Sequence, residues 1–336
     1  MRIKRATKVF GSQSMHFFCV IEMSQPSCYI HFKKGGIALK VDAVFAGGGV
    51  KAFAFVGAIE EAEQSGLEFE RIAGTSAGSI VAAFLMAGYT SEEINHLLNS
   101  LDVSTFRDER LAFVPLKIAK WLNLYFRMGL YKGDRLEEWL KEQLHQKGVA
   151  TFNDLPPGSL RIVVSDVTRG QMVVLPDDLP KYGLDPNRFS VATAVRMSCS
   201  IPFFFEPVKL KSLMVGNNSS YIVDGGLLSN FPMWIFKDGK RGGYRRPVIG
   251  FQLAPQNGDK HGNDIHNALD LYKAIFETMT HAHDARYISS EHAKNIVFIP
   301  IDHIKSTDFD VTIEEKQTMI DLGKEKTAQF LASWTG

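Results

Sequence analysis

The sequence lacks the features that mark several large classes of protein. Its three cysteines, Cys19, Cys28 and Cys199, form no CxxC or zinc-finger spacing, and their odd number argues against a disulfide framework. No run of 18 apolar residues is present, so no membrane-spanning helix is expected. The short N-terminal apolar run has no small-residue cleavage site, so no signal peptide is expected. These absences favour a cytoplasmic protein whose contact with a membrane would be peripheral.

An excess of charge of one sign is also missing. The sequence has 38 Lys and Arg residues against 37 Asp and Glu residues, so its net charge of +1 argues against nucleic acid as a partner. No cluster of Asp or His residues suggests a calcium or zinc site, so neither a metal nor another cofactor is expected. Basic residues do gather in residues 1–40, and Glu22 is the only acidic residue there. We expect this part to be either a poorly ordered extension or an arm that contacts an anionic membrane surface.

The rest of the sequence has the pattern of an α/β domain. Hydrophobic residues make up 45% of the 336 residues and charged residues 22%, a balance that can bury a large core without disulfides. From residue 41 onward, short apolar runs alternate with segments of helical periodicity. The expected strands are Val41–Ala46, Phe69–Ala73, Leu160–Val167, Met172–Leu175, Tyr221–Val223, Val248–Gln252 and Ile296–Ile299. The expected helices are Lys51–Gln64, Ser79–Ala87, one capped by Thr90, Asp134–Lys147, Ser190–Ser198, Asp264–His283 and Ile313–Leu331. This alternation predicts a three-layer domain over 41–336, with a mostly parallel central sheet and helices on both faces.

A Gly-x-Ser-x-Gly pattern lies where the second strand meets the second helix. Its glycines, Gly74 and Gly78, allow a sharp turn on which the hydroxyl of Ser76 stands exposed as a nucleophile. The N-terminus of the following helix adds partial positive charge where an oxyanion would form. The alternative is an ordinary glycine turn. The apolar strand before the pattern favours the nucleophile.

Three glycines, Gly47, Gly48 and Gly49, follow the first strand and precede Lys51. Glycines at this place allow a ligand to approach the backbone closely, with N–H groups free to donate at the start of a helix. In an acyl-transfer enzyme such donors form an oxyanion hole. The alternative is a tight strand-to-helix turn.

The same glycines also fit the dinucleotide-binding pattern G-x-G-x-x-G/A, with Ala52 at its last position. A nucleotide site of that type needs an acidic residue near the end of the second strand, to bind the ribose. The acidic residues of this strand, Glu68 and Glu70, lie at its start, and its end carries the serine motif instead. The dinucleotide interpretation is therefore rejected.

The glycine loop and the serine motif are expected to open at the same edge of the sheet, because they end neighbouring strands of one βαβ unit. Gly49 and Ser76 are 76 − 49 = 27 positions apart, about the length of one crossover. In an α/β-hydrolase the oxyanion loop follows the third strand, whereas here it follows the strand immediately before the nucleophile. This order disfavours the α/β-hydrolase fold.

Four motifs together resemble one known family. G-G-G-x-K precedes G-T-S-A-G, Asp224-Gly225-Gly226 follows much later, and residues 197–208 (MSCSIPFFFEPV) are similar to the stretch before the family's D-G-G/A motif. In this order the motifs resemble the patatin-like phospholipases over about residues 41–232. One departure is Ala52, where the family usually has glycine. The resemblance implies a patatin-like three-layer sandwich.

The resemblance also implies a serine lipid-acyl hydrolase with a Ser–Asp dyad. Ser76 would attack a fatty-acyl ester, Asp224 would take the proton, and the amides of residues 47–49 would hold the oxyanion. Water would then release the fatty acid, without a metal. The implied partner is a lipid substrate. The residues implied to support these motifs are Lys51, Gly74, Gly78, Gly225 and Gly226.

Two other functions stay open at this stage. The Asp-Gly-Gly sequence is by itself typical of a hairpin turn, and a lipid-binding protein without activity would keep the fold alone. An esterase of the α/β-hydrolase type would need a catalytic histidine after Asp224, and His281, His283, His292 and His303 all follow it. None of these histidines lies in a recognisable motif.

Residues 111–130 form an apolar and aromatic segment with interspersed basic residues, Lys117, Lys120 and Arg127. The pattern fits an interfacial helix or lid that admits an acyl chain, and it fits an ordinary buried helix equally well. Phe203, Phe204 and Phe205 likewise fit either an acyl pocket or the core.

Overall fold

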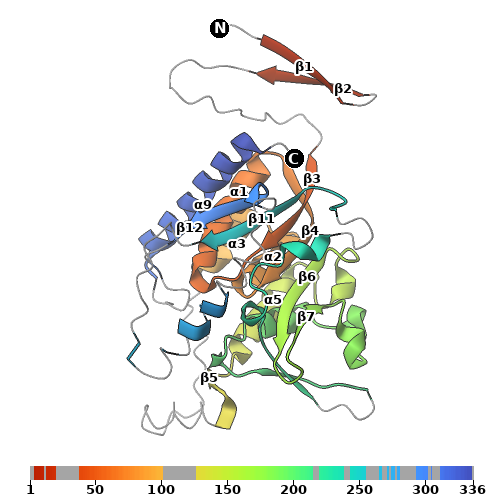
Figure 1. Cartoon of the computed structure of the whole chain (residues 1–336), viewed down its shortest axis with the longest axis vertical. Coiled ribbons are helices and arrows are strands. Elements are labelled where there is room, and N and C mark those ends of the chain that lie inside the picture. The colour runs from red at the N-terminus through yellow and green to blue at the C-terminus, as the bar shows by residue number, and fades with distance from the viewer. Residues whose placement is uncertain are drawn as a thin grey trace.

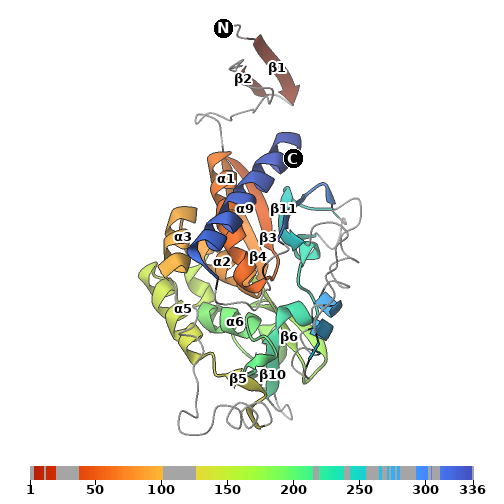
Figure 2. The ribbon, with the colours of Figure 1, turned by 90° about the vertical axis from the view of Figure 1, so that its left-hand side faces the viewer.

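The computed structural model describes most of the chain (Figures 1 and 2). The described residues are 4–10, 13–19, 38–100, 126–214, 219–237, 243–254, 265–266, 271, 274–276, 278–280, 293–301, 304 and 311–334. The four histidines considered for a triad and residues 111–125 of the apolar segment lie outside them.

An eight-stranded mixed sheet forms the centre of the molecule, in the order β12-β11-β3-β4-β6-β10-β9, with β7 paired to β6. The pairings from β12 to β6 are parallel, and those of β10 and β7 are antiparallel. The predicted mostly parallel sheet is thus confirmed. The strands are β3 (Leu39–Phe45), β4 (Leu67–Thr75), β6 (Leu160–Asp166), β7 (Gln171–Leu175), β9 (Val208–Leu210), β10 (Ser220–Asp224), β11 (Val248–Ala254) and β12 (Ile296–Pro300).

Helices cover both faces of this sheet. The chain steps from β3 to β4 to β6 in one direction, so right-handed crossovers place α1 and α2 on one face, where α9 packs against α1. The step from β11 to β12 runs the other way, so the helical residues described within 271–280 lie on the other face (Figure 2). The helices are α1 (Phe53–Gln64), α2 (Ala77–Met86), α3 (Ser91–Ser100), α5 (Asp134–Gln146), α6 (Val191–Ser198) and α9 (Ile313–Ser333).

The expected strands and helices are present on described residues, with ends that differ by up to a few positions. The exception is the start of the expected helix Asp264–His283, where Ile265 and His266 are not helical. Thr90 and Glu93 exchange the two hydrogen bonds of a capping box at the start of α3. The sequence did not predict the short parallel pair β5 (Gly129–Tyr131) and β8 (Phe203–Phe205), because strands of three residues carry almost no periodicity.

The basic N-terminal part contains two strands, β1 (Lys4–Phe10) and β2 (Gln13–Cys19), which pair antiparallel as a sheet of their own. β3 begins at Leu39, so the expected domain boundary after residue 40 falls inside a strand. No helix in the described part of the chain combines the length and the apolar character needed to cross a bilayer.

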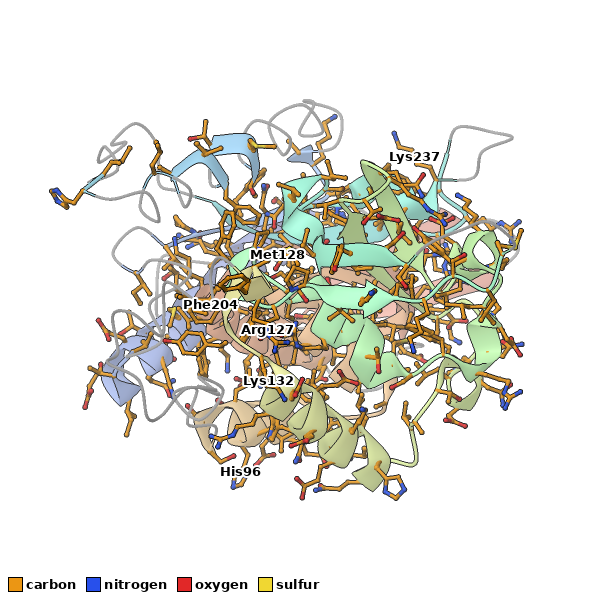
Figure 3. All side chains as sticks on the ribbon, turned by 90° about the horizontal axis from the view of Figure 1, so that it is seen from below. His96, Arg127, Met128, Lys132, Phe204 and Lys237 are labelled. Atoms are coloured by element: carbon orange, nitrogen blue, oxygen red, sulfur yellow. The ribbon has the colours of Figure 1, made fainter. Side chains whose placement is uncertain are left out.

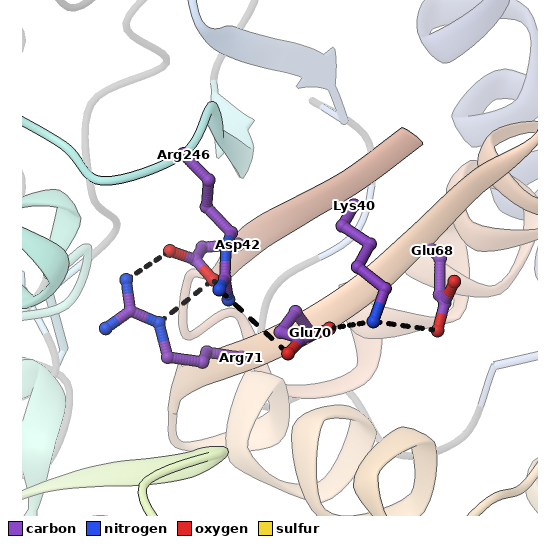
Figure 4. Close-up of polar contacts among 6 residues, drawn as sticks. All are labelled: Lys40, Asp42, Glu68, Glu70, Arg71 and Arg246. Carbon is purple, nitrogen blue, oxygen red and sulfur yellow. Dashed lines mark hydrogen bonds and ion pairs between the residues drawn. The ribbon is translucent and has the colours of Figure 1, made fainter. Parts of the chain in front are cut away.

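A charged cluster connects the N-terminal halves of the central strands β3 and β4 (Figure 4). The carboxylate of Asp42 is fully buried and accepts from Arg71 Nε at 3.0 Å and from Arg246 Nη1 at 3.1 Å. Arg246 precedes β11, so the buried charge joins β3 and β4 to the chain that enters β11. Lys40 pairs with Glu70 at the exposed end of the same cluster. A buried carboxylate paired with two guanidinium groups has its charge compensated, as the interior of a protein requires.

Candidate active site

Ser76 lies on the sharp turn between β4 and α2, with φ 51° and ψ −130°. A positive φ is strained for any residue with a side chain, and such strain persists only where the surroundings impose it. A side chain at Gly74 would lie 2.4 Å from the carbonyl oxygen of Gly78, and one at Gly78 would lie 2.4 Å from that of Ala46. The two glycines therefore allow β4 and α2 to approach each other closely enough for the sharp turn at Ser76 to form. The structure places Ser76 on the strand-to-helix turn that the sequence predicted, but the residue is buried, with 5% of its surface exposed, and does not stand exposed as expected.

Asp224 ends β10 and meets Ser76 inside the protein. Ser76 Oγ donates a hydrogen bond to Asp224 Oδ2 at 2.6 Å, and the Gly226 amide donates to Oδ1 at 2.7 Å. The residue Asp224 is 1% exposed, and the burial of its carboxyl raises the pKa from 3.8 to about 7, against the two hydrogen bonds, which lower it. The pair thus combines a hydroxyl with a carboxylate that is a stronger base than an exposed one.

The direction of β10 explains how Asp224 reaches this place. β6 continues for three residues past Val163, the partner of Thr75 at the end of β4. β10 pairs antiparallel with this extension, and its last residue, Asp224, lies opposite Val164. β10 therefore runs toward the end of β4, and its last residue, Asp224, lies beside the serine turn. A side chain at Gly225, the next residue, would lie 2.2 Å from the carbonyl oxygen of Val163, so only glycine allows this approach.

The glycine loop presents free backbone amides at the start of a 3₁₀ helix over Gly49–Ala52. Gly48 is the N-cap and Gly49 the first helical residue, with φ 55°, so helix geometry leaves both amides without an internal acceptor. Within the described residues neither amide donates a backbone hydrogen bond. The amide of Gly47, in contrast, donates to the carbonyl oxygen of Asn230 at 3.2 Å. Of the three glycines predicted as donors, Gly48 and Gly49 are therefore the ones available to a ligand.

Lys51 has a role that its place in the motif did not reveal. Its Nζ donates to the carbonyl oxygen of Ile301, just beyond β12, at 2.9 Å. The side chain is half-buried, and its hydrogen bond links the glycine loop to the end of β12, the strand beside β11.

Three residues that the sequence analysis did not name individually as site residues, Ser198, Asn230 and Ala77, lie around Ser76 and the glycine loop. The amide of Ser76 itself donates to Ser198 Oγ at 2.9 Å, and the main chain of Asn230 holds Gly47. Ala77 is the first residue of α2, so its amide has no acceptor within the helix, and it directly follows the serine. Ser198 belongs to the stretch 197–208 that carries part of the family resemblance. Ala77 could have been found from the Gly-x-Ser-x-Gly motif, in which it is the residue after the nucleophile, whereas nothing in a single sequence marks Asn230.

The pair β5–β8 brings the described end of the apolar segment 111–130 beside the three phenylalanines. Phe205 is buried, Phe204 is half-buried with its ring 5.0 Å from that of Tyr131, and Phe203 is 36% exposed. Met128, labelled beside Phe204 in Figure 3, is also exposed. Phe205 therefore belongs to the core, whereas Phe203 and Met128 are both exposed at the surface.

Groups of three or more His, Cys, Asp or Glu side chains that could hold a metal ion do not occur among the described residues. Both oxygens of Asp224 accept hydrogen bonds from Ser76 and Gly226. The triad with one of the four later histidines stays a hypothesis, since these residues lie outside the described part.

Comparison with known proteins gives a consistent result. A family model described as patatin-like phospholipase matches residues 43–237. The uncharacterized protein YqhO of Bacillus subtilis is 50% identical over 295 residues, which cover 88% of this chain and 99% of YqhO. Triacylglycerol lipase ptl3 of Schizosaccharomyces pombe is 29% identical over 57% of this chain and 38% of its own length. The crystal structure of VipD from Legionella pneumophila shares the fold, with a TM-score of 0.53 at 17% identity over 89% of this chain and 67% of VipD.

Proposed function

Because the chain belongs to the patatin-like phospholipase family, we propose that it is a serine hydrolase that cleaves fatty-acyl ester bonds of phospholipids or related lipids. The observation that carries the proposal is the hydrogen bond of 2.6 Å from Ser76 Oγ to the buried carboxylate of Asp224. The free amides of the glycine loop support it. The triacylglycerol lipase among the relatives is a further reason to expect a lipid ester as substrate.

In the first step, Ser76 Oγ attacks the ester carbonyl carbon while its proton passes to Asp224 Oδ2. A carboxylate of ordinary pKa is a weak base toward a serine hydroxyl. The pKa of about 7 makes Asp224 a better base near neutral pH. The proton then leaves with the alcohol of the lipid when the tetrahedral intermediate collapses to the acyl-serine.

The negative charge that develops on the carbonyl oxygen requires hydrogen-bond donors that are already in place. We assign this role to the amides of Gly48, Gly49 and Ala77, which lie at the starts of two helices. Removing one such donor typically lowers kcat by about 10²–10³-fold. In the second step, water attacks the acyl-serine, Asp224 takes a proton from the water, and Ser76 leaves with a proton as the fatty acid is released.

The proposal is tested by turnover of a short and a long p-nitrophenyl acyl ester in EDTA. The variants are Ser76→Ala and Asp224→Asn, both close in shape to the native side chains. We expect turnover by the wild-type protein and a loss of at least about 10³-fold in each variant, with folding unchanged by circular dichroism. The ratio of the two esters would begin to define the acyl pocket.

Two outcomes would contradict the proposal. Turnover that survives Ser76→Ala would remove the nucleophile assignment. Lipid binding without any turnover by the wild-type protein would favour a lipid-binding function for the same fold.

A further inference from the structure

The stretch 197–208 carries family resemblance but has no part in the chemistry described above. Its first turn, Ser198–Ser200, closes α6 and contacts both proposed catalytic residues. We propose that Ser198 is a positioning residue that holds the main chain of Ser76 in the geometry required for attack. This inference rests on the proposed function, in which Ser76 is the nucleophile.

The hydroxyl of Ser198 is the middle of a continuous hydrogen-bonded line. It accepts from the Ser76 amide at 2.9 Å and donates to the carbonyl oxygen of Val163 at 2.7 Å. Val163 belongs to β6 and is the partner of Thr75, the residue before the nucleophile. Ser198 is fully buried, so water does not compete for these bonds. The line therefore fixes the serine turn to the strand beside it.

Ser76 needs such a partner for two reasons. Its φ of 51° is strained, and strained residues keep their conformation only where neighbours over-determine it. Its amide is buried, and a buried amide without an acceptor is strongly unfavourable. Since this amide is already bonded to Ser198, it is not offered to the substrate. The oxyanion must then lie toward the glycine loop and Ala77.

The same turn also holds the base. The carbonyl oxygen of Ser200 accepts from the Asp224 amide at 2.9 Å. Arg196 is buried, and its guanidinium donates to Ser200 Oγ at 2.5 Å and to the carbonyl oxygen of Gly133 at 2.8 Å. Contacts outside the site thus hold the turn in place, and this turn holds the main chains of both Ser76 and Asp224.

Removing the hydroxyl of Ser198 should therefore affect the rate and not the binding of substrate. In Ser198→Ala the Ser76 amide loses its acceptor, and the serine turn shifts relative to Asp224. A misplacement of about 1 Å can lower the rate by about 10²-fold. We expect a decrease in kcat of about 10–100-fold with KM within about twofold of the wild type. The buried Ser198 touches no substrate, which is why KM should not change.

The experiment compares Ser198→Ala, Ser198→Cys and Ser220→Ala with the wild type. Ser220 is the matched control: it is fully buried in β10, and its hydroxyl has no hydrogen-bond partner in the part of the chain that the structure describes. Cysteine keeps a weak donor and acceptor at position 198, so kcat of Ser198→Cys should lie between those of Ser198→Ala and the wild type. Each protein is also labelled with a fluorophosphonate, whose rate constant reports the reactivity of Ser76 and whose end point reports the folded fraction.

We expect Ser198→Ala to label to the same end point as the wild type but more slowly, and Ser220→Ala to match the wild type in both. The inference is overturned if Ser198→Ala keeps wild-type kcat and labelling rate, or if its lower activity follows entirely from a lower end point. Should Ser198→Ala not fold, Ser198→Cys decides by the same two readouts. If the wild type is not labelled at Ser76, the proposed function fails, and this inference fails with it. That result is distinct from slow labelling of the variant alone.

Discussion

The carboxyl of Asp224 is almost fully buried, and burial raises its pKa from 3.8 to about 7. A general base acts only in its ionised form, and below its pKa it is protonated. We therefore expect kcat/KM for an uncharged ester to increase with pH and to reach half its plateau near pH 7. The measurement is kcat/KM from pH 5 to pH 9 at constant ionic strength. A profile that is flat across this range would show that a group other than this carboxyl limits the reaction.

The same shift predicts an opposite effect on stability. Between pH 3.8 and about 7 the unfolded Asp224 loses its proton while the folded one keeps it, so the free energy of unfolding decreases as pH increases through this range. In Asp224→Asn this decrease is absent. The variant should therefore be inactive and yet more stable than the wild type at pH 8, by up to about 4 kcal/mol, with little gain near pH 4.

This second prediction is checked by urea unfolding of the wild type and of Asp224→Asn at pH 4 and pH 8. The difference between the two pH values is its own control, because any general effect of the substitution is present at both. An equal change in stability at both pH values would mean that the folded Asp224 titrates like an exposed carboxyl.

The sequence predicted the residues that carry recognisable chemistry, and the structure brings Ser76 and Asp224 together across 148 positions. The sequence alone did not predict which amides of the glycine loop are free to donate to a ligand. That depends on Asn230, whose carbonyl oxygen reaches Gly47 from a segment that no local pattern connects with it. Asn230 acts through its carbonyl oxygen, which leaves no mark in side-chain type, and the Ser198 hydroxyl meets a main-chain amide 122 positions away. Both contacts became visible only in the fold.

At the scale of helices, α1 and α9 approach each other through glycine. A side chain at Gly323 would lie 1.9 Å from the carbonyl oxygen of Ala54, and one at Gly57 would lie 1.8 Å from that of Ile320. Gly323→Ala should therefore push the helices apart and lower the free energy of unfolding by about 1–3 kcal/mol. This loss would occur although alanine favours a helix by about 1 kcal/mol over glycine.

The measurement is again urea unfolding, together with kcat/KM. Gly243→Ala is the control, because a side chain at Gly243 would meet no atom of the described residues within 4 Å. Activity of Gly323→Ala should stay close to that of the wild type, since the contact lies in the helix layer and not at the serine turn. An unchanged or increased stability would show that the two helices can separate freely.

Element type was predictable where periodicity was strong, as in α1 and α5, and the alternation of strands and helices predicted the parallel part of the sheet, but the direction of β10 was not predictable. The apolar run that forms β10 reads the same whether the strand is parallel or antiparallel. Its direction follows from pairing with the extension of β6 beyond β4, a feature set by the lengths of strands that lie far apart in sequence. The sequence therefore indicated that Asp224 would reach the site, but not from which side.

At the scale of the whole molecule, the matched family region does not coincide with the sheet. The family model ends at residue 237, whereas β11, β12 and α9 all follow it. β11 pairs with β3 on the side opposite β4, and α9 packs along α1. The strand that carries the glycine loop and the helix that follows it are thus covered by the last third of the chain. β1 and β2 form a separate sheet and pair with none of these strands.

Two truncated chains should therefore behave in opposite ways. Residues 38–336 keep every strand of the eight-stranded sheet, and we expect one cooperative unfolding transition with the kcat/KM of the full chain. Residues 1–237 keep both proposed catalytic residues but leave one edge of β3 and the α9-facing side of α1 exposed, so we expect no cooperative transition and no turnover. The measurement is thermal unfolding with ester turnover for both. If 1–237 were folded and active, the motif-bearing region would be an independent domain. If 38–336 lost activity, the basic N-terminal part would belong to the catalytic unit.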